Sequence, residues 1–188
     1  MNYDCIYESP IGLLHLVSNG SELIGVHFSD QRRPAPPGGD PTIDPFPEAV
    51  EQLDKYFAGT LQRFDLPIVL HGTRFQIRAW NELTRIPFGE TISYKAQAEK
   101  IGSVARAVGL ANGQNPVPII VPCHRVIGTN GSLVGYGGGI VRKRALLQFE
   151  ATVRDFGPHH FPVLREHGTD ALPRGRGHTH NLETEVQS

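Results

Sequence analysis

The stretch NPVPIIVPCHRVIG occupies residues 115–128. Pro116 and Pro118 make a rigid turn, three apolar residues follow, and Pro122 stands directly before Cys123. Proline fixes the backbone φ angle, so this segment can hold the cysteine side chain at a set distance from a bound molecule. Helical patterns flank the stretch on both sides, which places it inside a mostly helical domain. We therefore take Cys123 as a candidate nucleophile.

A cysteine nucleophile needs help from neighbouring groups. A free thiol with a pKa near 8.5 is only about 3% thiolate at pH 7, so a base must take its proton and another group must orient that base. His124 is adjacent to Cys123, and Glu150 is the one acidic residue between positions 102 and 151. Neighbouring side chains on an extended segment point to opposite faces, which favours a bridging water between thiol and imidazole. The alternative is that Cys123 is a small buried apolar residue, as most isolated cysteines are.

Short helices are predicted around this segment, over residues 75–86, 94–100 and 104–112 and from about residue 142. Pro87 ends the first helix, Ser93 is placed to cap the second, and Gly102 separates the second from the third. Two short helices around a glycine-containing turn form the outline of a helix-turn-helix, whose second helix would carry Arg106. The outline alone is weak evidence, because many small helical pairs bind nothing.

The first thirty residues alternate between apolar and polar positions in the manner of strands. Asn19-Gly20 is a hairpin signal, and residues 23–28 supply the returning strand. Residues 31–47 contain six prolines and two adjacent glycines, which excludes a helix or an inner strand and predicts a loop. Apolar residues then recur at helical spacing from Val50 to Phe57, and Gly59 is placed to end that helix in a left-handed cap.

These patterns divide the chain into an α/β segment with a small antiparallel sheet (1–71), a mostly helical segment (72–154) and a tail (155–188). The tail is rich in glycine, proline and histidine and has little apolar periodicity, so we expect it to be largely disordered. Its dispersed histidines lack cysteine partners and fixed spacing, which argues against a metal site. No apolar run approaches the roughly 20 residues of a membrane-spanning helix, and the first residues lack a signal-peptide pattern. We expect a cytoplasmic protein with free thiols at Cys5 and Cys123.

The net charge of −1 hides an uneven distribution. Residues 1–71 carry four basic and ten acidic side chains, whereas residues 72–150 carry ten basic and four acidic ones. The middle segment, with its net charge of +6, is therefore suited to meet an anion such as nucleic acid. The alternative is that this segment complements the acidic first segment across an interface.

Several motifs together resemble one family, the O6-alkylguanine-DNA alkyltransferases, also called methylated-DNA–protein-cysteine methyltransferases. The motifs come in the family's order and at nearly its spacing, strongly over residues 72–150 and loosely over 1–71. They are Gly89-Glu90-Thr91-Ile92-Ser93-Tyr94, Ala105-Arg106-Ala107-Val108-Gly109, Asn115-Pro116, Pro122-Cys123-His124-Arg125-Val126-Ile127-Gly128, Gly135-Tyr136-Gly137-Gly138-Gly139 and Leu146-Leu147-Gln148-Phe149-Glu150. The resemblance implies a ribonuclease-H-like N-terminal domain and a winged helix-turn-helix-like C-terminal domain.

The resemblance also implies a reaction that needs no cofactor and no metal. Cys123 attacks the O6-alkyl carbon of guanine, or of O4-alkylthymine, while His124 takes the thiol proton through water and Glu150 holds the imidazole. Tyr94 would donate a hydrogen bond or proton toward the departing base, and Asn115 would stitch the turn under the site. The alkyl group stays on the cysteine, so each chain acts once.

The expected partner is double-stranded DNA that contains O6-alkylguanine. Arg106 would enter the base stack through the minor groove and fill the gap left by a flipped nucleotide. The carbonyls of Cys123 and Val126 would read the guanine amino group, and the N–H of Gly137 would meet O6. Further contacts with the nucleotide or its phosphates are implied for Ser93, Lys95, Thr129, Tyr136 and Gly138. A monomer suffices for the chemistry, and binding side by side on DNA stays open.

The sequence departs from the family pattern before Arg106. The turn over residues 101–106 is about two residues shorter than usual and lacks the usual proline. A damage sensor that binds flipped alkylguanine without repairing it is therefore an alternative function. A thiol-His-acid hydrolase unrelated to DNA is a further one.

Overall fold

Strands from the first thirty residues build the N-terminal domain of the computed structural model, which describes residues 2–30, 40–41 and 46–162. The sheet has the order β3-β2-β1-β4, with β1 antiparallel to β2, β2 antiparallel to β3, and β4 parallel to β1. The elements of this domain are β1 (Tyr3–Ser9), β2 (Gly12–Ser18), β3 (Leu23–Phe28), β4 (Asp40–Pro41) and α1 (Pro47–Phe57). The predicted turn at Asn19-Gly20 lies between β2 and β3, which confirms the hairpin. The edge strand β4 makes the sheet mixed, where the sequence predicted an antiparallel one.

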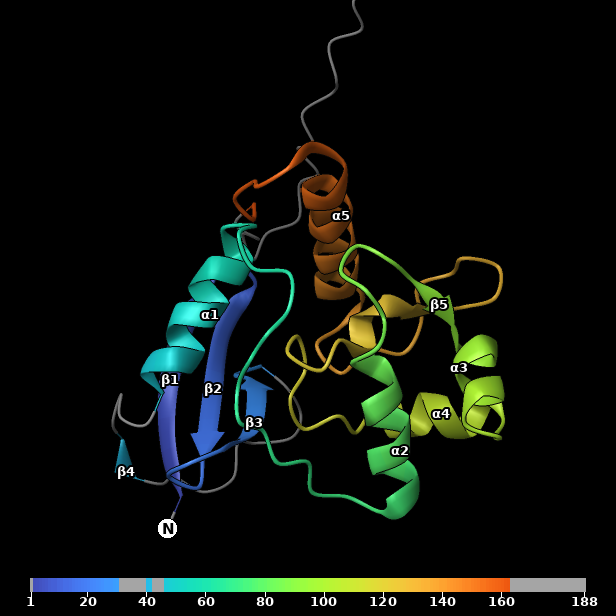
Figure 1. Cartoon of the computed structure of the whole chain (residues 1–188), viewed down its shortest axis with the longest axis horizontal. Coiled ribbons are helices and arrows are strands. Elements are labelled where there is room, and N and C mark those ends of the chain that lie inside the picture. Colours follow the sequence, from blue (N-terminus) through green and yellow to red (C-terminus); the bar gives the residue numbers. More distant parts are fainter. Residues whose placement is uncertain (1, 31–39, 42–45, 163–188) are drawn as a thin grey trace, which may run out of the picture.

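Helix α1 runs alongside β1 and β2 (Figure 1) and buries Leu53, Tyr56 and Phe57. It ends as predicted, because Gly59 adopts the left-handed conformation with φ +72°. Of the predicted loop at 31–47, residues 31–39 and 42–45 lie outside the described residues, while Pro47 begins α1.

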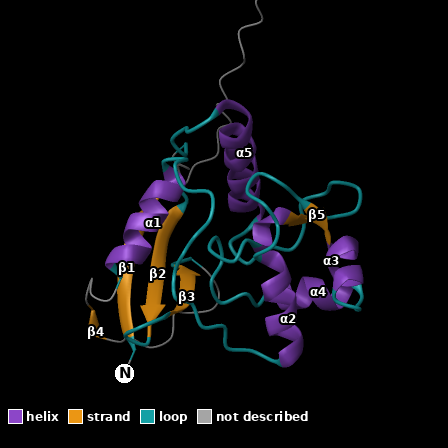
Figure 2. Ribbon diagram, viewed as in Figure 1, coloured by secondary structure: helices purple, strands orange, loops and turns teal. Residues whose placement is uncertain are grey.

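The second domain is mostly helical (Figure 2). Its elements are α2 (Arg74–Leu83), β5 (Ile92–Ser93), α3 (Tyr94–Lys100), α4 (Ala105–Asn112), the 3-10 turn η1 (Cys123–Arg125), β6 (Val126–Ile127) and α5 (Ile140–Phe156). The Ser93 hydroxyl accepts a hydrogen bond from the N–H of Ala96, so this residue caps α3 as predicted. Helix α2 ends at Leu83 rather than at the predicted 86. Pro87 disfavours helical backbone at the residue before it, so the helix has to end upstream.

Buried polar contacts hold α2, α3 and α4 in register. The indole Nε1 of Trp80 donates to the carbonyl of Ala111 at 2.8 Å. Gln97 and Asn112 exchange amide hydrogen bonds of 2.8 and 3.3 Å, and Gln97 also donates to the carbonyl of Ala79. Because buried amides must be paired, these bonds specify how the helix-turn-helix packs on α2.

Helix α5 lies at the top of Figure 1, to the right of α1 and above α2. It continues past the expected boundary at 154, and the chain then turns back toward α1. The N–H of Phe161 donates to the carbonyl of Phe57 at 2.8 Å, and the Phe161 ring packs on Phe57 and Phe149. Residues 155–161 therefore belong to the folded part of the chain, and the rest of the predicted tail, from 163, lies outside the described residues. Within the described ranges, no helix is both long and apolar enough to cross a membrane.

Gly59 offers a test of how the two domains meet. A Cβ at this position would lie 2.7 Å from the backbone N of His159, whereas a Cβ at Gly102 (φ +61°) would meet nothing within 4 Å. We expect Gly102→Ala to lower the free energy of unfolding by about 1–2 kcal/mol through backbone strain alone. Gly59→Ala should cost a further ~1–3 kcal/mol because the segment after α5 must move. Urea unfolding of both variants measures the difference, and equal losses would contradict this packing.

Candidate active site

Cys123 begins the 3-10 turn η1 and is 4% exposed. Asn115 organises the turn that precedes it. The Nδ2 of Asn115 donates to the carbonyl of Val121 at 2.7 Å and lies 3.2 Å from Cys123 Sγ, while its Oδ1 accepts from the N–H of Val117 at 3.0 Å. One amide thus closes the turn and touches the thiol sulfur.

Ile119, inside the same turn, carries backbone strain. Its φ is +75°, a conformation that β-branched residues rarely adopt. Its side chain is buried and packs in the core, which holds the backbone in this shape. Strain of this kind concentrates at functional sites, where surrounding structure over-determines the geometry. The prolines of this stretch account for rigidity, but only the fold reveals the strained residue.

Glu150 is fully buried on α5 and accepts five hydrogen bonds. Its Oε1 accepts from His124 Nε2 at 2.9 Å, from Tyr56 Oη at 2.8 Å and from Arg125 Nη2 at 2.9 Å. Its Oε2 accepts from Arg125 Nε at 2.8 Å and from the N–H of Gly89 at 3.0 Å. Burial alone would raise the pKa of the carboxyl, but His124 and Arg125 hold it well below its usual range.

The ionised carboxylate determines the state of His124. A carboxylate only accepts, so Nε2 of the imidazole must carry the proton that faces Glu150. Burial lowers the pKa of His124 against the opposing effect of Glu150, so the ring is neutral near pH 7. Its Nδ1 is buried without a hydrogen-bond partner in the described part of the chain. That nitrogen is therefore a free acceptor, which is what a general base requires.

The Cys123 thiol is protonated in the resting site. Burial raises its pKa to about 11, although Asn115 and the charge of Lys143 pull in the opposite direction. Burial likewise lowers the pKa of Lys143 to about 8. A thiol in this state cannot react until a base removes its proton.

Tyr94 and Lys143 tie the helix-turn-helix to the loop over residues 134–139, which we call the glycine loop. The Tyr94 hydroxyl lies 2.9 Å from the carbonyl oxygen of Val134 and 2.8 Å from that of Gly135. The buried Lys143 Nζ donates to the carbonyls of Val126 and Val134, both at 2.6 Å, and lies 3.3 Å from Tyr94 Oη. Burial raises the pKa of Tyr94 to about 12, so this hydroxyl keeps its proton.

A pocket of about 290 Å³ opens beside the thiol. Cys123, Asn115 and Gly137 line it from the helical domain, and His27 of β3 lines it from the N-terminal sheet. The Tyr136 ring stacks edge-on against His124, with 6.4 Å between ring centroids. The Tyr136 hydroxyl is, like His124 Nδ1, buried and unpartnered among the described residues. The carbonyl of Cys123 accepts from the N–H of Val126, and the carbonyl of the fully buried Val126 accepts from Lys143.

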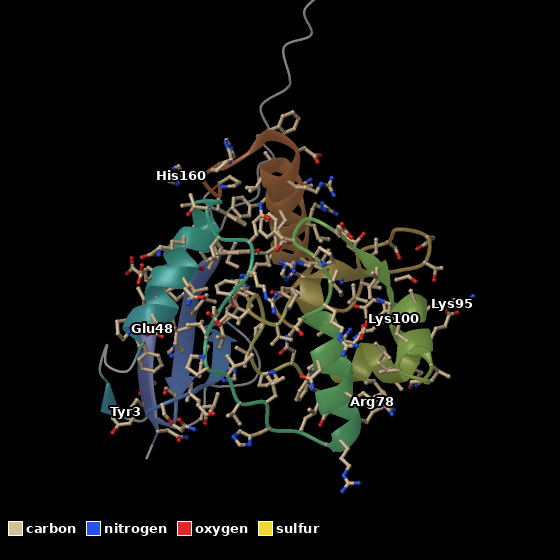
Figure 3. All side chains as sticks on the ribbon, in the orientation of Figure 1. Tyr3, Glu48, Arg78, Lys95, Lys100 and His160 are labelled. Atoms are coloured by element: carbon tan, nitrogen blue, oxygen red, sulfur yellow. The ribbon has the colours of Figure 1, made fainter. Side chains whose placement is uncertain are left out.

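The residues expected to contact DNA lie on the helical domain. Arg106 on α4, Lys95 on α3 and Thr129 after β6 are exposed, and Lys95 projects outward in Figure 3. Lys95 is 3.9 Å from Glu99, and the Ser93 hydroxyl is engaged as a helix cap. Val104, just before α4, and Leu110 on α4 are 66% and 67% exposed. In contrast, Gly138 is buried under Phe28 and Tyr136 rather than exposed.

Sequence reasoning missed the groups that support the site from behind. Tyr56 and Lys143 carry no local signal, since a tyrosine on α1 and a lysine on α5 look ordinary in sequence. Arg125 had a signal, because it stands inside the Pro122–Gly128 motif, but it received no role. The pairing of Arg125 with Glu150 and with the carbonyl of Ile86 exists only in the folded chain.

No group of three or more potential metal ligands occurs in the portion of the chain that the structure describes. The site contains a buried thiol, a neutral imidazole on the next residue, and an ionised carboxylate that is hydrogen-bonded to this imidazole. A helix-turn-helix lies in the same domain. This combination defines a class of DNA-binding proteins that carry a cysteine nucleophile in the same domain.

Comparison with known proteins identifies the family within that class. Residues 2–70 match the ribonuclease-like domain, and residues 74–152 the DNA binding domain, of 6-O-methylguanine DNA methyltransferase. The chain belongs to the 6-O-methylguanine DNA methyltransferase family. This membership confirms the resemblance and the fold class predicted from sequence, and it sets the hydrolase alternative aside.

Individual relatives are similar over most of their length. The methylated-DNA–protein-cysteine methyltransferase of Mycobacterium tuberculosis is 53% identical over 146 residues, which span 76% of this chain and 88% of that protein. The protein of the same name from Methanosarcina acetivorans is 45% identical, over 80% of this chain and 99% of that one. Among solved structures, Mycobacterium tuberculosis OGT in complex with DNA superimposes with a TM-score of 0.76 at 51% identity, covering 80% of this chain and 93% of that one.

The Glu150 network predicts a pH dependence of stability. Glu150 has a lowered pKa when folded, so it stabilises the fold above its unfolded pKa of about 4.3, and this contribution is lost as the pH falls further. Glu150→Gln should lower the free energy of unfolding at pH 7 by about 3–5 kcal/mol, because Arg125 loses its buried partner. Urea unfolding at several pH values from 7 to 3 should show that the free energy of unfolding falls less in the variant than in the wild type. Equal acid losses would show that this carboxyl does not carry the effect.

Proposed function

We propose that this protein reverses alkylation damage in DNA by moving the O6-alkyl group of guanine onto its own Cys123. O4-alkylthymine is a second expected substrate. The observation that carries the proposal is the 2.9 Å hydrogen bond between Glu150 and His124, the residue that follows the buried Cys123, in a domain that also holds the helix-turn-helix. The name of the two relatives, methylated-DNA–protein-cysteine methyltransferase, describes transfer of a methyl group from DNA to a protein cysteine.

The proton and the electrons can be followed through the site. A water between Cys123 Sγ and His124 Nδ1 carries the thiol proton to the imidazole, and Glu150 stabilises the imidazolium that forms. The sulfur then attacks the alkyl carbon, a carbon–sulfur bond forms, and the bond from carbon to O6 breaks. Guanine leaves as an anion and takes up a proton from solvent, while Tyr94 would turn its hydroxyl from the Val134 and Gly135 carbonyls to donate a hydrogen bond to it. The buried thioether is stable, so each chain acts once and no cofactor takes part.

Asn115 and Lys143 support the thiolate during this step. The Asn115 amide lies 3.2 Å from Sγ and can donate to it when it becomes negative. Lys143 is buried with its ammonium near Tyr94 and adds positive charge to a water-poor site. Such pre-oriented groups stabilise developing charge without rearranging.

DNA binding is assigned to the surface of α3 and α4. We place α4 in the groove, with exposed Arg106 entering the stack where the damaged nucleotide leaves it. Ser93, Lys95 and Thr129 would contact phosphates, while Tyr136 and Gly137 would lie beside the flipped base and the buried Val126 and Gly138 would lie behind them. Phosphate contacts carry little sequence information, so binding should be weak, sequence-tolerant and salt-sensitive. We propose that a monomer acts on double-stranded DNA in the cytoplasm, associated with the nucleoid when bound.

The decisive experiment is intact-protein mass spectrometry after mixing the chain with a duplex that contains O6-methylguanine. We expect a gain of one methylene, confined to the peptide with Cys123 and saturating at one per chain. Cys123→Ala should abolish this gain and keep its affinity for the duplex, because the substitution leaves every proposed DNA contact in place. Transfer by the variant would exclude Cys123 as the nucleophile. Tight binding without transfer by the wild type would favour the damage sensor instead.

Arg106→Ala tests nucleotide flipping. The substitution should slow transfer from the duplex by roughly 10- to 100-fold, since filling the stack offsets a few kcal/mol of extrusion cost. Transfer from free O6-benzylguanine should keep its wild-type rate, because a free base needs no extrusion. Arg63→Ala is a matched control, as it removes an exposed arginine of the N-terminal domain that has no proposed DNA contact and should leave both rates unchanged. Equal losses on duplex and free base would remove Arg106 from this role.

A further inference from the structure

Arg142, at the start of α5, joins the N-terminal sheet to the glycine loop. Its Nε donates to the carbonyl of Ile11 at 2.6 Å, and its Nη1 donates to the carbonyl of Gly138 at 3.0 Å. Its Nη2 lies 3.0 Å from the carboxylate of Asp30. The guanidinium carbon also stacks over the Phe28 ring at 4.6 Å. The Arg142 side chain is 20% exposed. It bridges the two domains through a contact with Ile11, which lies 131 residues earlier in the chain.

The glycine loop is pressed against the sheet at the same point. A Cβ on Gly138 would lie 2.6 Å from Phe28 Cε2 and 2.6 Å from Tyr136 Cε1, so only glycine fits there. The Phe28 ring meets Tyr136 edge-on, with 6.3 Å between centroids, and Tyr136 in turn meets His124. Contact thus runs without a break from β3 through the loop to the imidazole.

The loop supplies part of the pocket wall and binds the Tyr94 hydroxyl. Gly137 lines the pocket beside Cys123. The Tyr94 hydroxyl is bound by the Val134 and Gly135 carbonyls at the other end of the loop. A shift of the loop would therefore move the Gly137 backbone and release the Tyr94 hydroxyl together.

We propose that Arg142 is a positioning residue, through which the N-terminal domain fixes the glycine loop over Cys123 and so sets the rate of alkyl transfer. The inference rests on the proposed function, because it concerns the same pocket. It assigns the N-terminal sheet a part in the reaction although that domain supplies none of the reacting atoms.

Arginine suits this position for a physical reason. Its planar guanidinium offers several donors at fixed angles, so it can bond two carbonyls, pair with Asp30 and stack on a ring at once. Lysine has one flexible ammonium and cannot keep both carbonyl bonds in that geometry. Loss of the fork leaves the carbonyl of Gly138 without this donor and frees the loop to move.

Single-turnover kinetics separates positioning from folding. The measurements are the rate constant at saturating O6-methylguanine duplex, the rate with free O6-benzylguanine, and the number of alkyl groups bound per chain. Arg142→Ala should still accept one alkyl group per chain but react about 10- to 100-fold more slowly, since small misplacements at a reacting centre have effects of that size. The loss should be equal on duplex and free base, because the loop meets the base in both.

Phe161→Ala is the matched control. The substitution removes a different interdomain contact, in which the Phe161 ring packs on Phe57 of α1 and Phe149 of α5. Neither ring belongs to the glycine loop. We expect it to lower thermal stability while the rate constant stays at the wild-type value. Arg142→Lys should also slow transfer, because lysine loses the two carbonyl bonds. It keeps the charge beside Asp30, so it provides the test if the alanine variant does not fold.

The outcomes distinguish this inference from the proposed function. A wild-type chain that accepts no alkyl group would refute the function itself. If the wild type reacts, then wild-type rate constants in both Arg142 variants would overturn the positioning role alone. Fewer than one alkyl group per chain at the wild-type rate would show a purely structural role, and equal slowing by Phe161→Ala would show that general domain docking is responsible.

Discussion

The buried carboxylate of Glu150 is the interaction on which the arrangement depends. It gathers donors from α1, from the loop before β5 and from η1 around one charge on α5. A buried carboxylate is costly unless all its lone pairs are used, and its five hydrogen bonds meet that demand. Because those donors come from both domains, satisfying one charge also aligns the domains and orients the imidazole beside the thiol.

The three groups of the site divide the protonation states among themselves. Glu150 is ionised, His124 is neutral with its proton toward Glu150, and Cys123 keeps its thiol proton. Burial acts on each in the direction of the neutral form, and only Glu150 overcomes it, because it has the positive charge of Arg125 and several hydrogen-bond donors around it. The result is a protected nucleophile that is unreactive in the resting protein and requires a base at the moment of transfer.

Helix α5 explains how a domain without reacting groups can matter for the chemistry. Its first turn carries Arg142 to the sheet, its middle carries Glu150 to Tyr56 of α1, and the chain after it brings Phe161 back onto Phe57. The helix is thus fixed to the N-terminal domain along its length. The carboxylate behind His124 takes its position from the Tyr56 contact, and the glycine loop in front of Cys123 takes its position from Arg142.

The sequence alone determined the elements and the chemistry that is written locally. Proline, glycine and capping residues placed the hairpin, the caps at Ser93 and Gly59 and the short helices, and the Pro122–Gly128 motif marked the nucleophile. Tertiary structure decided what local patterns do not encode: the partners of Glu150, the strained φ of Ile119, and the contacts of Lys143 and Arg142 with distant carbonyls. The reason is that a cap or turn is set by neighbours in the chain, whereas a buried charge is satisfied by whichever groups folding brings to it.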